Sequence, residues 1–202
     1  HNVQLKYSGA EISITSPLSH LANIKKGKIY IRDIYSLYKY DNFLMAYEMT
    51  GEQIKKWLDF NTDNWFSQVT KSGDSVLRWK EESGDKVLIP RSYNFDNFAG
   101  IEYEIDLTKP EGKKVNIIKM SNGEPFSLTK KYKVAINSFR ASGGGSHLYK
   151  SGVNPDNFYY NSAPVAIRNM IVDYIKEKKN ISVIPNNNWK LIPTDIINEG
   201  LL

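Results

Sequence analysis

The sequence contains no cysteine and only three histidines, and these shortages limit the chemistry available to the chain. Without cysteine there is no thiol nucleophile, zinc knuckle or disulfide framework. His1, His20 and His147 show no metal-binding spacing, so a histidine-rich metal site cannot be assembled from this chain alone. The Gly-x-Ser-x-Gly elbow that would support a Ser-His-Asp triad is also missing. We expect each histidine to lie at the surface.

Long hydrophobic runs are absent as well. No stretch approaches the roughly 18 uninterrupted apolar residues of a membrane helix, so no membrane span is expected. The sequence does not open with a basic, apolar and then small-residue leader, and we expect any export signal to lie outside it or to have been removed. The hydrophobic content of 41% and the length of 202 residues predict one compact domain with a sizeable core.

The net charge of +5 mildly favours anionic partners such as nucleotides, nucleic acid or a wall polymer. Basic residues occur in ones and twos along the chain, as in Lys25-Lys26 and Lys178-Lys179. A dispersed pattern of this kind indicates a solvated surface rather than a footprint for duplex DNA. We therefore expect no binding of duplex nucleic acid.

Hydrophobic periodicity predicts an α+β fold of mixed strands and hairpins with interspersed helices. Thr50 and Gln53 form a capping box in front of a helix whose apolar face holds Ile54, Trp57 and Leu58. Residues 61–90 are expected to form a long ordered loop. Strands are expected at residues 10–15, 28–32, 43–49, 101–107, 114–119, 132–137 and 181–184, and helices at 17–26, 33–37, after the Thr50 cap and after a Ser162 cap.

Three consecutive glycines, Gly143–Gly145, follow the strand at 132–137. Such a run costs backbone entropy, so a folded protein tolerates it where the backbone makes a close approach or adopts positive φ. A flexible hairpin tip is the alternative. The run lacks the Lys-Ser/Thr of a phosphate loop and no helix is expected after it, which disfavours a Walker-type NTPase. It does place an aromatic ring, Phe139, and a guanidinium, Arg140, at the mouth of a strand.

A second aromatic loop lies at residues 37–42. Tyr40 in this loop either packs back onto the core or offers a face for stacking. Several segments then agree in order with one family: the sequence resembles the C-terminal domain of the 5'-nucleotidases, from about Val3 to Trp189. It is most similar to the bacterial 2',3'-cyclic-nucleotide 2'-phosphodiesterase/3'-nucleotidase branch. The segments that carry the resemblance are 40–42, 50–51, 93–96, 100–108 and 134–144.

The resemblance implies a division of labour between two domains. An N-terminal metallophosphoesterase domain, absent from this chain, would hold a divalent metal pair and the catalytic residues. Residues 1–202 would form the C-terminal domain that recognises the nucleoside, with no catalytic residue, metal ligand or cofactor of its own. The expected parent enzyme hydrolyses 2',3'-cyclic nucleotides and 3'-nucleotides, and this chain alone is expected to be inactive. We expect an extracellular or cell-wall-associated protein, or a periplasmic one where an outer membrane exists.

The resemblance also implies a substrate site. Two rings, at Tyr40 and Phe139, would clamp the base, and the Asn42 amide would lie at the base edge unless it only holds an Asx-turn. The glycine backbone would lie close to the sugar and base. The residues expected to bind substrate are Tyr40, Asn42, Phe139, Arg140, Ser142, Gly143, Gly144 and Gly145.

Two positions depart from the 5'-nucleotidase pattern. Leu21 stands where those enzymes have a phosphate-clamping arginine, and Gly145 replaces an acidic residue that holds the ribose hydroxyls. Both departures suit a phosphate on the 2' and 3' oxygens. Two alternatives stay open: a non-enzymatic binding module for wall polymer or RNA, and a structural domain whose glycine run is only a turn.

Overall fold

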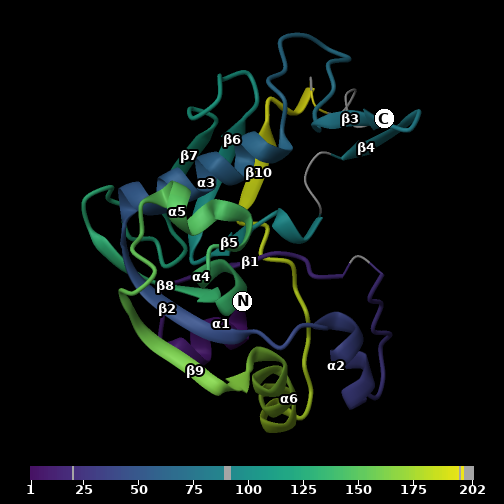
Figure 1. The fold of residues 1–202 in the computed structure, drawn as a ribbon, viewed down its shortest axis with the longest axis vertical. Coiled ribbons are helices and arrows are strands. Elements are labelled where there is room, and N and C mark those ends of the chain that lie inside the picture. The colour runs from purple at the N-terminus through teal and green to yellow at the C-terminus, as the bar shows by residue number, and fades with distance from the viewer. Residues whose placement is uncertain (20, 89–91, 196, 198–202) are drawn as a thin grey trace.

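A five-stranded sheet organises the molecule (Figure 1). The structure is a computed structural model that describes residues 1–19, 21–88, 92–195 and 197. The strand order is β5-β1-β8-β2-β9, and the central strand β8 runs parallel to β1 and antiparallel to β2. The strands of this main sheet are β1 (Ile12–Thr15), β2 (Phe43–Thr50), β5 (Asn97–Ala99), β8 (Lys131–Asn137) and β9 (Phe158–Ala166).

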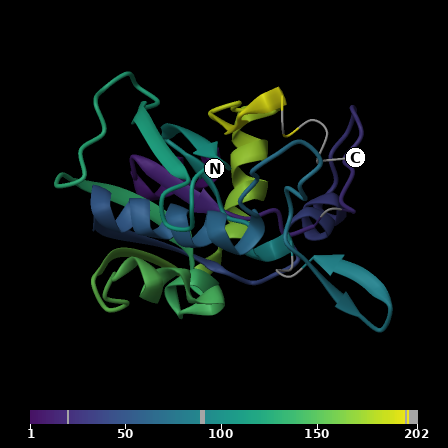
Figure 2. The same cartoon turned by 90° about the horizontal axis from the view of Figure 1, so that it is seen from above.

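A smaller sheet has the order β10-β6-β7, and a separate hairpin pairs β3 with β4. The alternation of Ile101, Tyr103 and Ile105 buries one face of β6, as the sequence predicts, and β7 returns antiparallel to it. Figure 2 shows the β3–β4 hairpin projecting away from the other elements. The bounds are β6 (Ile101–Asp106), β7 (Val115–Met120), β10 (Trp189–Ile192), β3 (Trp79–Glu82) and β4 (Asp85–Leu88).

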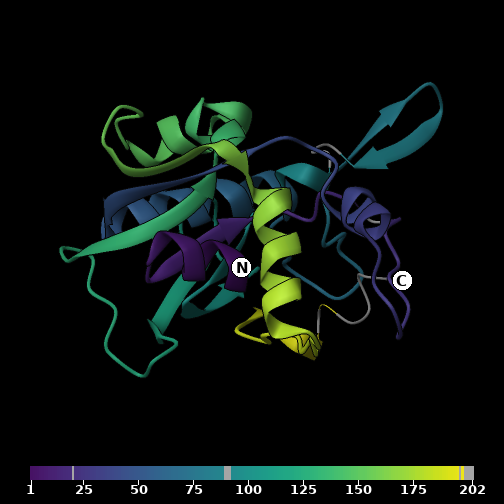
Figure 3. The same cartoon turned by 90° about the horizontal axis from the view of Figure 1, so that it is seen from below.

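Helices cover both faces of the main sheet. Met45, Tyr47 and Met49 of β2 pack with the buried face of α3, whereas Leu44 packs with α6 on the opposite side. Figure 3 shows α6 and α1 together on this second face. The helices are α1 (Asn2–Ser8), α2 (Ile31–Leu37), α3 (Gly51–Trp65), α4 (Ser138–Ala141), α5 (His147–Ser151) and α6 (Ile167–Lys178), with 3-10 turns at Ser92–Asn94 and Gly144–Ser146.

The capping box forms as predicted. The Gln53 N–H donates to Thr50 Oγ1 over 3.3 Å, and the Thr50 N–H donates to Gln53 Oε1 over 2.9 Å. The helix that follows buries Ile54, Trp57 and Leu58 completely. The α+β fold of strands, hairpins and interspersed helices is therefore confirmed. None of the helices in the described ranges is long and apolar enough to cross a bilayer.

Three sequence predictions on the N-terminal half are wrong. The described part of 17–26 contains no helix, and Leu21, which would lie on its apolar face, is 82% exposed, so the Pro17 start signal has no buried stripe behind it. The strand expected at 28–32 is absent, since Ile31 already begins α2. The expected loop at 61–90 instead holds the end of α3 and the β3–β4 hairpin, apart from 89–91, which lie outside the described residues.

Two predictions on the C-terminal part are also wrong. Ser162 does not cap a helix: it lies in β9, where its Oγ accepts the Leu44 N–H over 2.9 Å and donates to the Val165 carbonyl. The helix begins five residues later, at Ile167, with Ala166 as its N-cap. The strand expected at 181–184 has no regular structure, and the last strand of the described residues is β10.

Candidate functional site

The two aromatic rings that are expected to clamp the base, Tyr40 and Phe139, lie beside the ends of two neighbouring strands of the main sheet. Leu44 of β2 is paired with Asn137 of β8, and the Phe43 N–H donates to Ser138 Oγ over 3.0 Å. Tyr40 precedes β2 and Phe139 follows β8, so the strand register brings their segments side by side. Their exposed fractions are 39% and 43%. Among the described aromatic residues, neither ring packs against another ring. Lys39 Nζ lies 5.1 Å from the centre of the Tyr40 ring, and the Arg140 guanidinium lies 5.4 Å from that of Phe139.

Arg168 of α6 holds the loop that carries Tyr40. Its guanidinium is buried, donates to Asp41 Oδ1 and to the Tyr38 carbonyl, and lies 3.9 Å from the centre of the Tyr35 ring. These contacts fix the backbone on both sides of Tyr40 while its ring stays outside. This role could not be predicted from the sequence, because Arg168 is more than 120 residues away from the loop.

Asn42 is half-buried beside Tyr40. Its side-chain amide faces the Tyr38 hydroxyl, with 3.5 Å between Nδ2 and Oη, and its backbone carbonyl accepts the Ile167 N–H over 2.8 Å. The first contact is at the outer limit of a hydrogen bond. It differs from an Asx-turn, in which the Asn42 oxygen would accept a backbone N–H further along the chain.

The glycine run is an ordered turn and not a flexible tip. Gly143 and Gly145 adopt φ of 90° and 71°, a region that L side chains rarely enter. The Phe139 ring lies on Gly144, where an added Cβ would be 2.5 Å from Phe139 Cζ. The expectation that no helix follows the glycine run is wrong, since α5 begins at His147. Another short helix, α4, precedes the run and begins at Ser138. The Asn137 side chain caps α4 by accepting the Arg140 N–H.

Replacing Gly144 with alanine is expected to displace the Phe139 ring. Gly144 has no positive φ, and the groups within 3 Å of the new methyl are atoms of that ring, the free end of a side chain. We expect the Phe139 ring proton resonances to move while the free energy of unfolding changes by less than about 1 kcal/mol. The matched control is Gly144→Ala in a Phe139→Ala background, where no ring can be displaced. If Gly144→Ala shifts the resonances of neighbouring backbone amides equally with and without the ring, the contact is contradicted.

Arg140 is buried rather than presented to a ligand. Its Nε and Nη2 donate to the Asp96 carboxylate over 2.8–3.1 Å, and Nη1 donates to Asn94 Oδ1 and to the Gly144 carbonyl. The Tyr93 carbonyl accepts a further bond from Nη2. The guanidinium thus ties the glycine run to residues 93–96. This geometry favours a positioning role for Arg140 over the direct substrate contact expected from the sequence.

Asp96 is the centre of the buried polar cluster beneath the glycine run. It is 1% exposed and accepts bonds from Arg140 and from Trp57 Nε1, the latter over 2.8 Å. Its backbone N–H donates to Asn61 Oδ1. Sequence reasoning did not single out Asp96 as a functional residue. The available signal was its place in the Tyr-Asn-Phe-Asp segment, where an acidic residue follows a phenylalanine.

His147 is buried, so the expectation of a surface histidine is wrong here. Its ring lies between Trp57 and Phe60, with ring centres 5.7 and 5.0 Å away, and its Nε2 is 3.7 Å from Asp96 Oδ2. Burial among these rings lowers the pKa of His147 to about 4, against a partial opposing effect of the Asp96 charge. His1 is half-buried, with Nδ1 2.9 Å from Ser13 Oγ, and His20 lies outside the described residues.

The lowered pKa of His147 predicts a loss of stability in mild acid. The unfolded chain takes up a proton near pH 6.5, whereas the folded protein resists protonation until about pH 4. The contribution of the neutral His147 ring to the free energy of unfolding is therefore complete above pH 6.5. It falls by about 3 kcal/mol as the pH drops to 4. Urea unfolding of the wild type and His147→Gln between these pH values tests this. The variant is expected to show a shallower fall, and equal slopes would contradict the assignment.

The remaining expected site residue is Ser142. It is exposed, and its Oγ donates to the Phe139 carbonyl over 3.0 Å, which stabilises the turn below the ring. The structure thus brings Phe139, Ser142 and the glycines together on one turn, with Tyr40 and Asn42 on the adjoining loop. Leu21, at the position of the expected departure, is 82% exposed.

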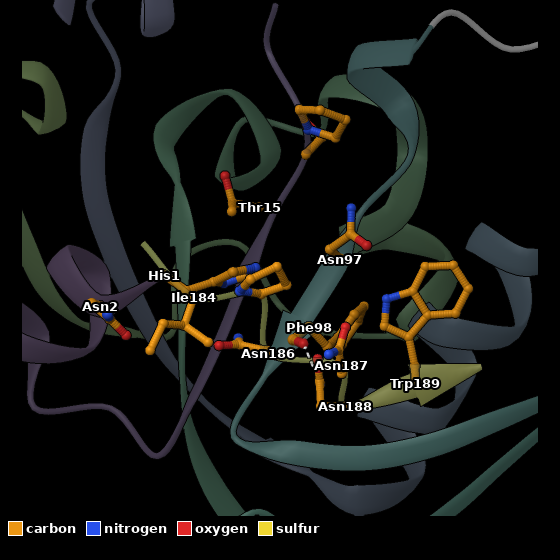
Figure 4. Close-up of a pocket in the computed structure, with 13 residues that line it drawn as sticks. His1, Asn2, Thr15, Asn97, Phe98, Ile184, Asn186, Asn187, Asn188 and Trp189 are labelled. Atoms are coloured by element: carbon orange, nitrogen blue, oxygen red, sulfur yellow. Dashed lines mark hydrogen bonds between the residues drawn. The ribbon is translucent and has the colours of Figure 1, made fainter. Parts of the chain in front are cut away.

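Two cavities lie away from these residues. One, of about 600 Å³, is bordered by asparagines and by Phe98 and Trp189 (Figure 4). Its Asn188 amide is already bonded to the Phe98 and Ile101 carbonyls. A second, of about 800 Å³, is mainly apolar and lies between α1, α2 and α6. Across the described ranges, no group of three or more His, Asp or Glu side chains is placed to hold a metal ion.

Comparisons with known proteins show the family of this domain. The family model of the 5'-nucleotidase C-terminal domain matches residues 1–150. The chain is 33% identical over 189 residues to the trifunctional nucleotide phosphoesterase YfkN of Bacillus subtilis, covering 87% of this chain and 12% of that protein. It is 32% identical over 188 residues to the 2',3'-cyclic-nucleotide 2'-phosphodiesterase/3'-nucleotidase of Haemophilus influenzae, covering 84% of this chain and 26% of that protein.

A solved structure shows the same fold. The 5'-nucleotidase precursor of Thermus thermophilus superimposes with a TM-score of 0.68 at 20% identity, covering 94% of this chain and 34% of that one. The chain therefore spans about a third or less of the length of each of these relatives. With the family model matching well over half of its residues, the chain belongs to the 5'-nucleotidase family and corresponds to its C-terminal domain.

Proposed function

We propose that residues 1–202 are the nucleoside-recognition domain of a metal-dependent hydrolase acting on 2',3'-cyclic nucleotides and 3'-nucleotides. The observation that carries the proposal is the pair of exposed rings, Tyr40 and Phe139, on adjoining segments that are each anchored by a buried arginine. The names of the relatives from B. subtilis and H. influenzae support this substrate class. They favour it over a binding module for wall polymer.

The two rings suit the recognition of a nucleobase. Stacking a base on an aromatic ring contributes about 1–3 kcal/mol and tolerates every base, because each base has a π-face. The Asn42 amide beside Tyr40 can both donate and accept at a base edge. Anchoring by Arg140 and Arg168 keeps the segments ordered before a ligand arrives, which lowers the entropic cost of binding.

Chemistry at phosphorus would belong to the other domain. A divalent metal pair there would activate a water molecule, while this chain binds and orients the nucleoside. The family resemblance implies that those metals belong to the N-terminal metallophosphoesterase domain. This chain alone is accordingly proposed to have no turnover. An extracellular, cell-wall or periplasmic location, suited to nucleotide salvage, remains part of the proposal.

Calorimetric titration of the chain with adenosine, 3'-AMP and ribose tests the proposal. Adenosine and 3'-AMP are expected to bind and ribose to fail, because the base supplies the stacking. Incubation of the chain with 2',3'-cyclic AMP and divalent metal is expected to yield no product. Failure of both adenosine and 3'-AMP to bind would contradict nucleoside recognition, and turnover by the chain would contradict the division of labour.

A further inference from the structure

Three basic side chains around α2 carry uncompensated charge. Lys28, Arg32 and Lys39 are exposed, and none of them forms an ion pair with a described residue. By contrast, Lys130 and Lys131 at the start of β8 pair with Glu11 and Glu48. The positive charge at α2 is therefore available to an anionic partner.

Exposed aromatic rings alternate with these cations. Tyr30 and Tyr35 are 52% and 51% exposed. The Arg32 guanidinium lies 4.8 Å from the centre of the Tyr30 ring, and Lys39 Nζ lies 5.1 Å from that of Tyr40. We call Lys28, Tyr30, Arg32, Tyr35 and Lys39 the α2 surface. Aromatic platforms interleaved with cations are the arrangement that binds single-stranded nucleic acid.

The α2 surface is continuous with the nucleoside site. Helix α2 ends at Leu37, three residues before Tyr40, and lies beside α6 (Figures 1 and 3). Arg168 contacts both the Tyr35 ring and Asp41, so one side chain links the two regions. Of the nearby acidic residues, Asp41 is paired with Arg168, and Asp33 accepts the Tyr30 N–H over 2.7 Å.

We propose that the α2 surface binds the nucleotide joined to the 5' oxygen of the nucleoside held by Tyr40 and Phe139. This inference rests on the proposed function and extends its substrate class to short single-stranded oligoribonucleotides with a 3'-phosphate or 2',3'-cyclic phosphate end. In such a substrate the reacting phosphate is on the 2' and 3' oxygens, so the rest of the strand continues from the 5' oxygen.

The size of the surface limits the length of the strand. A helix of seven residues spans about 10 Å, which provides one additional stacking and phosphate site rather than a track along a polymer. The preceding base would stack on Tyr30, because the Arg168 guanidinium already lies against the Tyr35 ring, and Arg32 and Lys39 would face the linking phosphodiester. A duplex, whose bases are already paired and stacked, would gain nothing from these rings.

Titration with 3'-AMP and with the adenosine dinucleotide ApAp tests the inference. ApAp is expected to bind about tenfold more tightly, the effect of one added base on an aromatic platform. Its affinity should also fall more steeply with salt, because of the additional phosphate contact. The Tyr30→Ala/Arg32→Gln variant is expected to lose the tenfold gain and keep the affinity for 3'-AMP.

Lys133 and Tyr159 supply the matched control. They form a similar exposed pair on the main sheet, with Lys133 Nζ 5.6 Å from the ring centre, so Tyr159→Ala/Lys133→Gln should leave both affinities unchanged. Equal affinity of the wild type for the two ligands, or a gain that survives in the Tyr30/Arg32 variant, would overturn the inference while leaving nucleoside recognition intact. Absence of 3'-AMP binding to the wild type would overturn both.

Discussion

Asp96→Ala is expected to lower the free energy of unfolding by about 3–5 kcal/mol, since it leaves the buried Arg140 guanidinium without its counter-charge. Asp96 and Arg140 are 1% and 2% exposed, so water cannot replace the lost carboxylate. The substitution also removes the acceptor of the Trp57 indole N–H in the middle of the core. Urea unfolding at neutral pH, followed by tryptophan fluorescence, measures the loss.

An exposed ion pair provides the control for this experiment. Glu52 pairs with Lys56 on the surface of α3, with side chains more than half exposed. Glu52→Ala is expected to cost less than about 1 kcal/mol, because exposed pairs are screened by solvent. A loss in Asp96→Ala no larger than in the control would contradict the account of the polar cluster as the anchor of the glycine run.

Truncation of both Tyr40 and Phe139 to alanine is expected to abolish measurable nucleoside binding. Tyr40→Ala and Phe139→Ala each remove one stacking surface, worth about 1–3 kcal/mol, or roughly tenfold or more in the dissociation constant. The double variant loses both faces of the clamp. The free energy of unfolding should change little, because both rings are about two-fifths exposed and support no core packing. Calorimetric titration with adenosine measures the affinity.

Tyr159→Ala is the control for the Tyr40→Ala and Phe139→Ala variants. Tyr159 is a tyrosine of similar exposure, 42%, on a strand of the same sheet, and its truncation should leave adenosine affinity unchanged. If the Tyr40/Phe139 double variant binds adenosine as tightly as the wild type, the two rings do not hold the base. An equal loss in Tyr159→Ala would likewise contradict a specific clamp.

The parts of the fold that the sequence predicted correctly depend on neighbours in the chain. Thr50 and Gln53 are three residues apart and form the capping box through local contacts. The alternation within 101–106 is visible without knowing which strand lies beside it. The wrong predictions used local signals. The signal at Pro17 lacked tertiary support. The signal at Ser162 was overridden by another contact, because its hydroxyl accepts the Leu44 N–H of the neighbouring strand β2.

In the site, too, residues with local signals could be predicted and residues held by long-range contacts could not. Tyr40 and Phe139 could be noticed as aromatic residues beside predicted strand ends, and the family resemblance then implied that they clamp a base. Arg140 on the same turn could not be placed, since a guanidinium beside a glycine run fits both a ligand contact and a buried anchor. Its partner Asp96 is 44 residues away, and only the folded chain brings the two together. The burial of His147 depends on the same long-range packing, against Trp57 and Phe60 of α3.

The clamp of a nucleobase between Tyr40 and Phe139 is the central claim. Intermolecular nuclear Overhauser effects between adenosine and protein labelled on its aromatic rings test it most directly. The account predicts contacts from the adenine H2 and H8 protons to the ring protons of both residues, in the same complex. Adenosine contacts that involve neither ring, such as contacts to Phe98 and Trp189 in the cavity of Figure 4, would contradict it.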